Sequence, residues 1–313
     1  MTGKLNFDPE GYCKANESPW WNQSFYFSFY DSTMKIGCFI RVGILENLQE
    51  SNNWFVFFQD GKPLYSRLNM NLPYIGERLA DGLESSGIRM KAVKPLEQAQ
   101  ISFEERDFAV DLTWSAMHPL SDSIAMSATE GGSFHSNVAH VHLEGPCRIT
   151  GTVRLRDGST VAINGTGFRD VSVGQRNWDA LLHYALAWPI FEDGVTFAGI
   201  RGISTDGNNN YMKHFHDGDR WLRVKSITDD NRYEADELTL KSMDWTFRDE
   251  LDREWGFTAK PLFRWFFPFD TFVVAEHMME YRRHDGVVGY GMGECGFRFP
   301  WKGITPELTG GGR

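Results

Sequence analysis

The sequence lacks the features that mark membrane and secreted proteins. No apolar run approaches the roughly 18–20 residues of a membrane-spanning helix, and the first ten residues hold no basic segment followed by an apolar one, as a signal peptide would. Cysteines are few, far apart and without any Cys-x-x-Cys pair: Cys13, Cys38, Cys147 and Cys295. We therefore expect reduced thiols rather than a disulfide framework or a zinc site, in a cytoplasmic protein without a membrane span.

Positive charge is also scarce. The chain has 32 Lys and Arg against 42 Asp and Glu, a formal net charge of −10 at pH 7. Nucleic acids bind to basic faces, and no cluster of lysine or arginine overrides the acidic balance. We therefore exclude nucleic acid as a partner. The sequence also carries no clear nucleotide or metal motif, and it predicts a protein that needs no cofactor.

Aromatic residues are what the sequence has in excess. It contains 24 Phe, 11 Trp and 10 Tyr, which make up 14% of the chain, while its 41% hydrophobic and 24% charged residues are ordinary for a globular protein. Aromatic side chains suit strands and line apolar ligand sites. A length of 313 residues is enough for two domains or for two fused lobes.

The hydrophobic pattern is that of antiparallel strands. Between residues 24 and 30, Phe25, Phe27 and Phe29 alternate with Ser and Tyr, which is the period of a strand with one very apolar face. The Asp60-Gly61 pair between two such runs is a strong hairpin signal. Further Asp-Gly pairs begin at 81, 157, 193, 206, 217 and 285. We expect a meander of hairpins.

Helix is expected to be minor. Residues 72–84 are a modest helix candidate, weakened by Gly76 and Gly82, and residues 1–18 are expected to form an arm over the surface. So many antiparallel strands must hide their edges, and closure into barrels is the usual solution. We predict an all-β protein of two β-barrel-like lobes with little helix, divided into residues 1–172 and 173–313.

A polar stretch near the middle of the chain is the leading candidate for a functional site. Residues 165–179 hold two carboxylates, two arginines, a tryptophan and three glycines. Glycines spaced so closely indicate tightly bent or closely approached backbone. The alternative is a bulged strand followed by a loop, in which Asp170 and Arg176 form a structural ion pair.

Three motifs resemble those of a known family. The Trp20-Trp21 pair resembles an "EWWY" start, Arg169–Trp178 resembles an "rDHsWGpRdW" signature, and Gly289–Glu294 resembles a closing "GyGxxE" strand. They are similar to the motifs of the AttH/carotenoid 1,2-hydratase (CrtC-like) group of double lipocalin-like proteins. The resemblance spans roughly residues 20–300 and implies two lipocalin-like antiparallel β-barrel lobes.

The sequence also departs from the family pattern. Val171 stands where the family has His, and Val173 stands where it has Trp. Asn22 and Gln23 lie near the place of an expected Tyr or Glu. If the family histidine takes part in proton transfer, that role is absent here or is carried by another residue.

The resemblance implies acid–base chemistry on large apolar, often isoprenoid, molecules: hydration, dehydration, isomerisation or cyclisation. Protonating an alkene or a tertiary alcohol creates cationic character, and a carboxylic acid can deliver the proton if burial raises its pKa. Aromatic faces can stabilise the cation. The expected partner is a small apolar, isoprenoid-like substrate.

Candidate residues follow from these motifs. Asp170 is the first candidate for the catalytic acid or base, with an ion pair to Arg169 or Arg176 as its alternative. Glu294 is the second candidate, with a salt bridge that closes a barrel end as its alternative. Tyr290 could relay a proton, although a buried tyrosine with a satisfied hydroxyl is commoner. The expected substrate-binding residues are Trp21, Tyr26, Arg176 and Trp178, of which Arg176 and Trp178 could instead hold the lobes together.

Two His-x-His pairs leave a metal site open. His140 and His142, and likewise His214 and His216, would each share one face of a strand, and Glu144 would extend the first pair. The Glu spacing differs from that of the cupin metal motif, so hydrogen-bonded strand histidines are the expected outcome. Three hypotheses therefore follow from the sequence: a cofactor-free lyase or isomerase, which we favour, a carrier of a lipid-like ligand, and a His-x-His metalloenzyme.

Overall fold

The computed structural model describes residues 8–127, 137–269 and 271–299. Strands dominate these residues, and they form two antiparallel sheets, one a half-barrel and the other a nearly closed barrel. The predicted all-β class with little helix is confirmed. The helical elements are short: η1 (Glu46–Leu48), α1 (Ser123–Ser127) and η2 (Trp178–Ala180). Across the described ranges, no helix combines the length and apolar character needed to cross a membrane.

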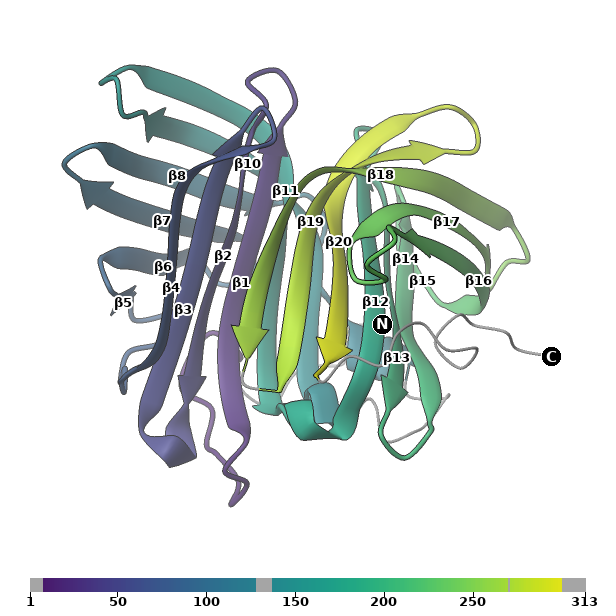
Figure 1. The fold of residues 1–313 in the computed structure, drawn as a ribbon, viewed down its shortest axis with the longest axis horizontal. Coiled ribbons are helices and arrows are strands. Elements are labelled where there is room, and N and C mark those ends of the chain that lie inside the picture. The colour runs from purple at the N-terminus through teal and green to yellow at the C-terminus, as the bar shows by residue number, and fades with distance from the viewer. Residues whose placement is uncertain (1–7, 128–136, 270, 300–313) are drawn as a thin grey trace. The chain divides into compact units, whose positions relative to one another are not determined.

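The first sheet belongs to a unit that contains the described residues up to Asp122 together with Ala139–Arg176. Its strands, each hydrogen-bonded to the next (Figure 1), run in the order β4 (Lys62–Pro73), β3 (Glu50–Gln59), β2 (Ile36–Leu45), β1 (Trp21–Asp31), β11 (Thr160–Gln175), β10 (Val141–Arg154), β8 (Phe108–Ala116), β7 (Gln98–Glu105), β6 (Ile88–Lys94) and β5 (Leu83–Ser85). The short β9 (Ser121–Asp122) pairs with β10. Asn53 on β3, the neighbour of the end strand β4, donates to the hydroxyl of Ser85 on the other end strand, β5, at 2.6 Å.

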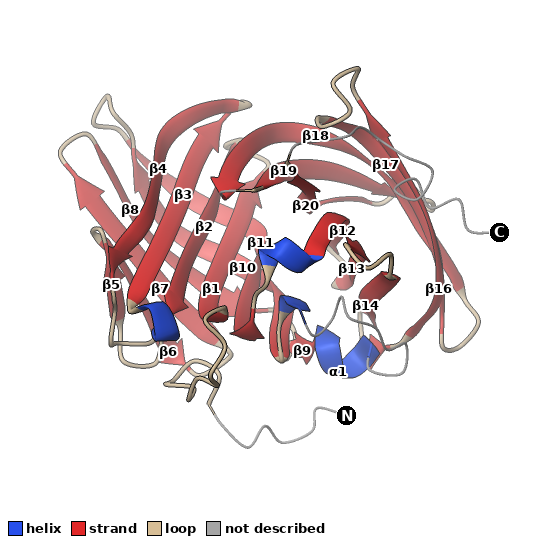
Figure 2. Cartoon of the chain, turned by 60° about the horizontal axis from the view of Figure 1, so that its bottom comes forward, coloured by secondary structure: helices blue, strands red, loops and turns tan. Residues whose placement is uncertain are grey.

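The second sheet belongs to a unit that contains the remaining described residues. Its order is β15 (Trp221–Leu222), β14 (Asn209–Asp217), β13 (Val195–Ser204), β12 (Leu181–Phe191), β20 (Val288–Arg298), β19 (Phe272–Arg283), β18 (Glu254–Phe269), β17 (Leu240–Asp249) and β16 (Val224–Tyr233). Figure 2 shows the strong curvature of β16, β17 and β18. That curvature brings β16 back to β14, where the Tyr211 hydroxyl donates to Asp229 at 2.7 Å. The predicted boundary at residues 172 and 173 lies inside β11, and the division of the chain there into two folding domains stays a prediction.

The alternation predicted for residues 24–30 sets the core of the first unit. Phe25, Phe27 and Phe29 are fully buried in its hydrophobic cluster, and the rings of Phe27 and Phe29 lie 5.4 and 5.9 Å from that of Trp114. The same strand is buried on its other face too, where Tyr26 is only 6% exposed. A strand buried on both faces can place polar groups away from bulk water.

Six of the seven Asp-Gly pairs lie in hairpin turns between paired strands, and Asp81-Gly82 does not, because β4 and β5 lie at opposite ends of the sheet. Asp60 and Gly61 both have positive φ, 48° and 72°, as the type I′ turn between β3 and β4 requires. The hairpin at Asp157-Gly158 has a longer turn than the two-residue turn at Asp60-Gly61. Leu155 and Ser159 pair across it, and Gly158 sits in the left-handed region at φ 84°. This turn fixes the register of β10 on β11.

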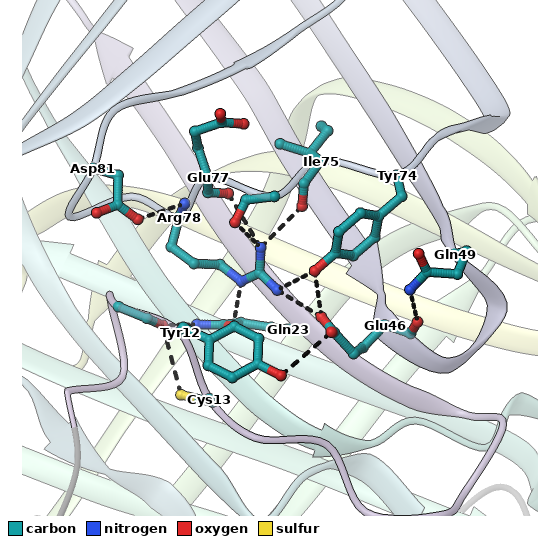
Figure 3. Close-up of polar contacts among 12 residues, drawn as sticks. Tyr12, Cys13, Gln23, Glu46, Gln49, Tyr74, Ile75, Glu77, Arg78 and Asp81 are labelled. Carbon is teal, nitrogen blue, oxygen red and sulfur yellow. Dashed lines mark hydrogen bonds and ion pairs between the residues drawn. The ribbon is translucent and has the colours of Figure 1, made fainter.

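Two predictions about the first hundred residues are wrong. Residues 72–84 form no helix, because the segment after β4 wraps around Arg78, whose guanidinium binds the carbonyls of Ile75 and Gly76 at 2.9 and 2.8 Å (Figure 3). Nor does the N-terminal arm lie wholly on the surface. Glu10 is fully buried, and its carboxylate forms an ion pair with Arg169.

Candidate active site

Asp170 lies in the middle of β11, between two strands that both supply polar neighbours. The register places it opposite Tyr26 of β1 on one side and Glu144 of β10 on the other. Side chains two apart along a strand share a face, so Ser172 lies on the same face as Asp170 and Val171 lies on the opposite one. Val171 belongs to the hydrophobic core. The Asp170 side chain is 14% exposed.

His142 connects Asp170 to Glu144. It lies opposite Ser172 and therefore diagonal to Asp170, a geometry within reach of a long side chain. Its Nε2 forms a hydrogen bond with Asp170 Oδ2 and lies 3.3 Å from Glu144 Oε1. His142 and Glu144 are 4% and 2% exposed. The three side chains form one compact acidic cluster around an imidazole, which we call the Asp170 cluster.

The charge of this imidazole follows from its neighbours. Burial alone would lower the pKa of His142, but the nearby carboxylates of Asp170 and Glu144 outweigh it and raise the pKa to about 9. His142 is therefore an imidazolium at neutral pH. The cluster then holds one exchangeable proton between two carboxylates, an arrangement suited to giving and taking a proton.

A row of buried polar side chains continues along the same face. Arg41 of β2 donates to Asn52 at 2.7 Å and to Asn22 at 3.1 Å, and Asn22 donates to Ser24 at 3.3 Å. Ser24 lies opposite Ser172 in the register. Arg41 also lies 4.6 Å from the ring centre of Trp54, which fixes its guanidinium plane.

The predicted binding residues of the first unit fall in different places. Tyr26 lies beside Asp170 in the register, and its ring is 5.9 Å from that of Phe168. Arg176, just beyond β11, donates to the Ser172 hydroxyl at 2.8 Å. Trp21 belongs to the opposite, core-facing side and meets His140 edge-on at 5.4 Å. The structure thus gathers Tyr26 and Arg176, but not Trp21, on the face that carries Asp170.

The ion-pair alternative for Asp170 takes another form in the structure. Arg169 points to the opposite face of β11, where it pairs with Glu10. The partner of Asp170 is His142, which the sequence marked only as a potential metal ligand. Its signal was present, because His142 and Glu144 share a strand face, but the register of β10 on β11 was needed to interpret it.

The remaining candidates belong to the second unit. Glu294 on β20 accepts a hydrogen bond from the Tyr184 hydroxyl and lies opposite Glu276 of β19, which is fully buried. Glu276 was missed, since nothing in its strand-like segment distinguishes it before the pairing is known. Tyr290 lies four residues before Glu294, about 13 Å along the strand. Trp178 stacks on Phe269 and Phe272 at 5.3 and 5.2 Å.

Of the two histidine pairs, only one residue joins a potential metal site. His140 is exposed and precedes β10, so it does not share a strand face with His142. His214 and His216 do share a face of β14, and both contact the ring of Trp221, at 4.6 and 5.0 Å. Within the described ranges, the one group of ligating side chains close enough to hold a metal ion is the Asp170 cluster, whose ligand atoms lie within 4.8 Å of one another.

Comparison with known proteins identifies a matching family and solved structures with a similar fold. The sequence matches the family described as "Domain of unknown function (DUF7064)" over residues 11–298. Among curated proteins, no relative matches it significantly. Similar solved structures include AttH (NE1406) from Nitrosomonas europaea, with a TM-score of 0.64, 12% identity and coverage of 94% of this chain and 97% of that one. At so low an identity the likeness establishes the fold.

Two further structures have the same fold. CghA, solved with Sch210972, has a TM-score of 0.63 and 12% identity, over 93% of this chain and 95% of that one. Kievitone hydratase from Nectria haematococca has a TM-score of 0.59 and 9% identity, over 88% of both chains. The predicted resemblance to the AttH-like group is confirmed, and the structural neighbours include a hydratase.

Proposed function

The chain belongs to the DUF7064 family, and from its fold and the Asp170 cluster we propose that it is a hydro-lyase or isomerase that works by acid–base catalysis. The observation that carries the proposal is the position of His142, which bonds Asp170 and lies 3.3 Å from Glu144 on a buried strand face. The name of one structural neighbour, kievitone hydratase, supports the same reaction class.

In this proposal Asp170 exchanges the proton with the substrate. For dehydration, Asp170 donates a proton to the leaving hydroxyl as the carbon–oxygen bond breaks, and it then accepts the proton lost from the adjacent carbon. One water is released and the cluster returns to its starting state. His142 is the positioning residue that supplies and receives the proton through its bond to Asp170, and Glu144 keeps the imidazole charged and oriented. Hydration is the reverse sequence.

The surroundings of Asp170 favour an apolar substrate. The aromatic rings of Tyr26 and Phe168 lie on its face, and each such ring can stabilise a developing carbocation by about 0.5–2 kcal/mol. Arg41 and Arg176 are held by Asn and Ser side chains along the same face, where they can orient an oxygen substituent. We propose an apolar alcohol or alkene, of the terpenoid type, as the substrate.

The proposal can be tested before the substrate is identified. The purified protein is incubated with an apolar metabolite extract in water labelled with heavy oxygen, and mass spectrometry searches for compounds that gain or lose one water. The matched inactive variant is Asp170→Asn, and the control is Glu104→Gln, whose side chain is 82% exposed on β7. Conversion by the wild type and Glu104→Gln but not by Asp170→Asn supports the proposal. Equal conversion by all three refutes it.

A second candidate function rests on the same three side chains. Two carboxylates and one imidazole within 4.8 Å could hold a divalent cation. Such a cation requires a neutral His142 and displaces its proton. Metal analysis of protein purified without a histidine tag decides between the two, because a stoichiometric metal that is lost in Asp170→Asn favours the metalloenzyme. Wild-type protein without metal that still converts substrate favours the acid–base enzyme.

A further inference from the structure

The ion pair between Glu10 and Arg169 is unlike the other ion pairs of the first unit. Both side chains are fully buried, and they come from the N-terminal arm and from the centre of β11. Arg169 projects from the core-facing side of β11, the opposite side from Asp170. An inference about this pair is therefore independent of the proposed function.

Arg169 is short of hydrogen-bond acceptors. A guanidinium has five N–H donors, yet among the described residues Nε and Nη1 of Arg169 have no hydrogen-bond partner, while Nη2 faces Glu10 in the ion pair. Glu10 turns one oxygen, Oε1, toward Arg169. Its other oxygen, Oε2, accepts from the backbone N–H of Leu96 at 2.7 Å. Glu10 thus presents one oxygen to Arg169 rather than making the bidentate contact that is common between a carboxylate and arginine.

The surroundings of Arg169 are apolar. In the register it lies between Phe27 of β1, whose ring centre is 5.7 Å away, and Gly145 of β10, which has no side chain. Val171, two residues along the strand, belongs to the hydrophobic cluster. Burial lowers the pKa of Arg169 to about 10, so it remains a cation at neutral pH. A buried cation with unused donors is costly unless an anion is bound to it.

The arm that carries Glu10 is held by hydrogen bonds to its backbone and by Cys13, which is buried in the hydrophobic cluster. Gln23 donates to the carbonyls of Pro9 and Gly11 at 2.9 and 2.8 Å. Farther along, the ring of Tyr12 lies beside the guanidinium of Arg78 (Figure 3). The guanidinium carbon is 5.3 Å from the ring centre. These contacts place residues 8–13 against the strands but outside the sheet. None of these contacts is a strand pairing, so displacement of the arm would leave the sheet hydrogen bonds in place.

We propose that Arg169 anchors a binding site for an apolar carboxylic acid inside the first unit, and that Glu10 is a tethered occupant which such a ligand displaces. The ligand carboxylate forms a bidentate pair with the guanidinium of Arg169. Its apolar tail takes the place of the arm, next to the aromatic side chains that share this core. Displacement of Glu10 frees the arm, so the occupied and unoccupied states differ at residues 8–13.

The first experiment removes the tethered occupant. Binding of the fluorescent fatty acid cis-parinaric acid, and of its methyl ester, is measured for the wild type, for Glu10→Ala and for Glu17→Ala. Glu17 is the matched control, because it lies on the same arm but is exposed. We expect Glu10→Ala to bind the acid about tenfold or more tightly than the other two proteins, since it lacks the internal competitor. The ester should show no such gain.

The role of Arg169 is tested in the same assay. In the double variant Glu10→Ala/Arg169→Met both charges are gone, so no buried charge is left without a partner, and the gain for the acid should disappear. A gain that survives in the double variant, or equal binding of acid and ester by Glu10→Ala, overturns the proposal.

A second measurement uses the wild type and does not depend on any variant folding. Lys14 is exposed on the arm and offers a cleavage site to trypsin. If a carboxylate displaces Glu10, decanoate should speed cleavage after Lys14 several-fold, whereas decanol at the same concentration should not. Equal effects of decanoate and decanol, or no effect of either, overturn the proposal.

Discussion

The raised pKa of His142 makes the stability of the protein depend on pH in a way that can be calculated. The pKa is 6.5 for an ordinary histidine and about 9 in the folded protein, because the two carboxylates outweigh the effect of burial. The folded state therefore holds this proton more tightly than the unfolded state does. A difference of about 2.5 units, at about 1.4 kcal/mol each, corresponds to about 3 kcal/mol.

The sign of the effect is fixed by the direction of the pKa shift. Below pH 6.5 both states are protonated, and the full contribution of about 3 kcal/mol is present. As the pH rises from 6.5 through 9, the unfolded state loses its proton first and the contribution is progressively lost. Above this range the protonation of His142 no longer contributes to stability.

The assay compares urea unfolding of the wild type and His142→Gln at a series of pH values from 6 to 10. Subtracting one free energy of unfolding from the other removes the groups that titrate alike in both proteins. The control is His284→Gln, whose side chain is 51% exposed. We expect the difference for His142 to shrink by about 3 kcal/mol across the window and that for His284 to stay flat. A flat or rising difference for His142 would refute the assigned charge state.

Other predictions concern stability and the site. Asp170→Asn removes the largest charge that raises the pKa of His142, so the alkaline loss of stability should be smaller and should end at a lower pH, as read from the same urea series. His183 and His277 have folded pKa values of about 4, because burial lowers them. For each of them, the free energy of unfolding should fall by up to about 3 kcal/mol as the pH falls from 6.5 toward 4. The variant His277→Gln should lack the part of this loss that is due to His277. Arg78→Met should lower the free energy of unfolding by about 3–5 kcal/mol, because it leaves the acceptors around a 1%-exposed guanidinium without their donor; the urea midpoint measures this, and a loss below about 1 kcal/mol would contradict it.

The strands and hairpins were predictable because their signals are local. Alternation at Phe25, Phe27 and Phe29 depends only on the period of a strand, and the Asp60-Gly61 turn depends only on two positive φ values. The same period placed Arg169 and Asp170 on opposite faces of one strand. An ion pair between these two neighbours was therefore an unfavourable alternative from the start.

The site was harder to predict because it depends on register. A two-residue turn at Asp157-Gly158 would shift β10 by one residue on β11 and place Glu144 beside Val171. The longer turn in the structure, with Gly158 in the left-handed region, places Glu144 beside Asp170 instead. The burial of Glu10 was not predictable either, because its partner lies far along the chain and no periodic pattern marks an irregular arm.

The central claim is that Asp170, with His142, transfers the proton. Its most direct test is the rate of the conversion found in the metabolite screen, measured for Asp170→Asn, His142→Gln and Glu294→Gln, with the fold of each variant checked by its melting temperature. We predict that the first two rates fall roughly 100-fold or more while Glu294→Gln stays near the wild type. A folded Asp170→Asn protein with wild-type turnover, together with an inactive Glu294→Gln, would contradict the claim and place the chemistry in the second unit.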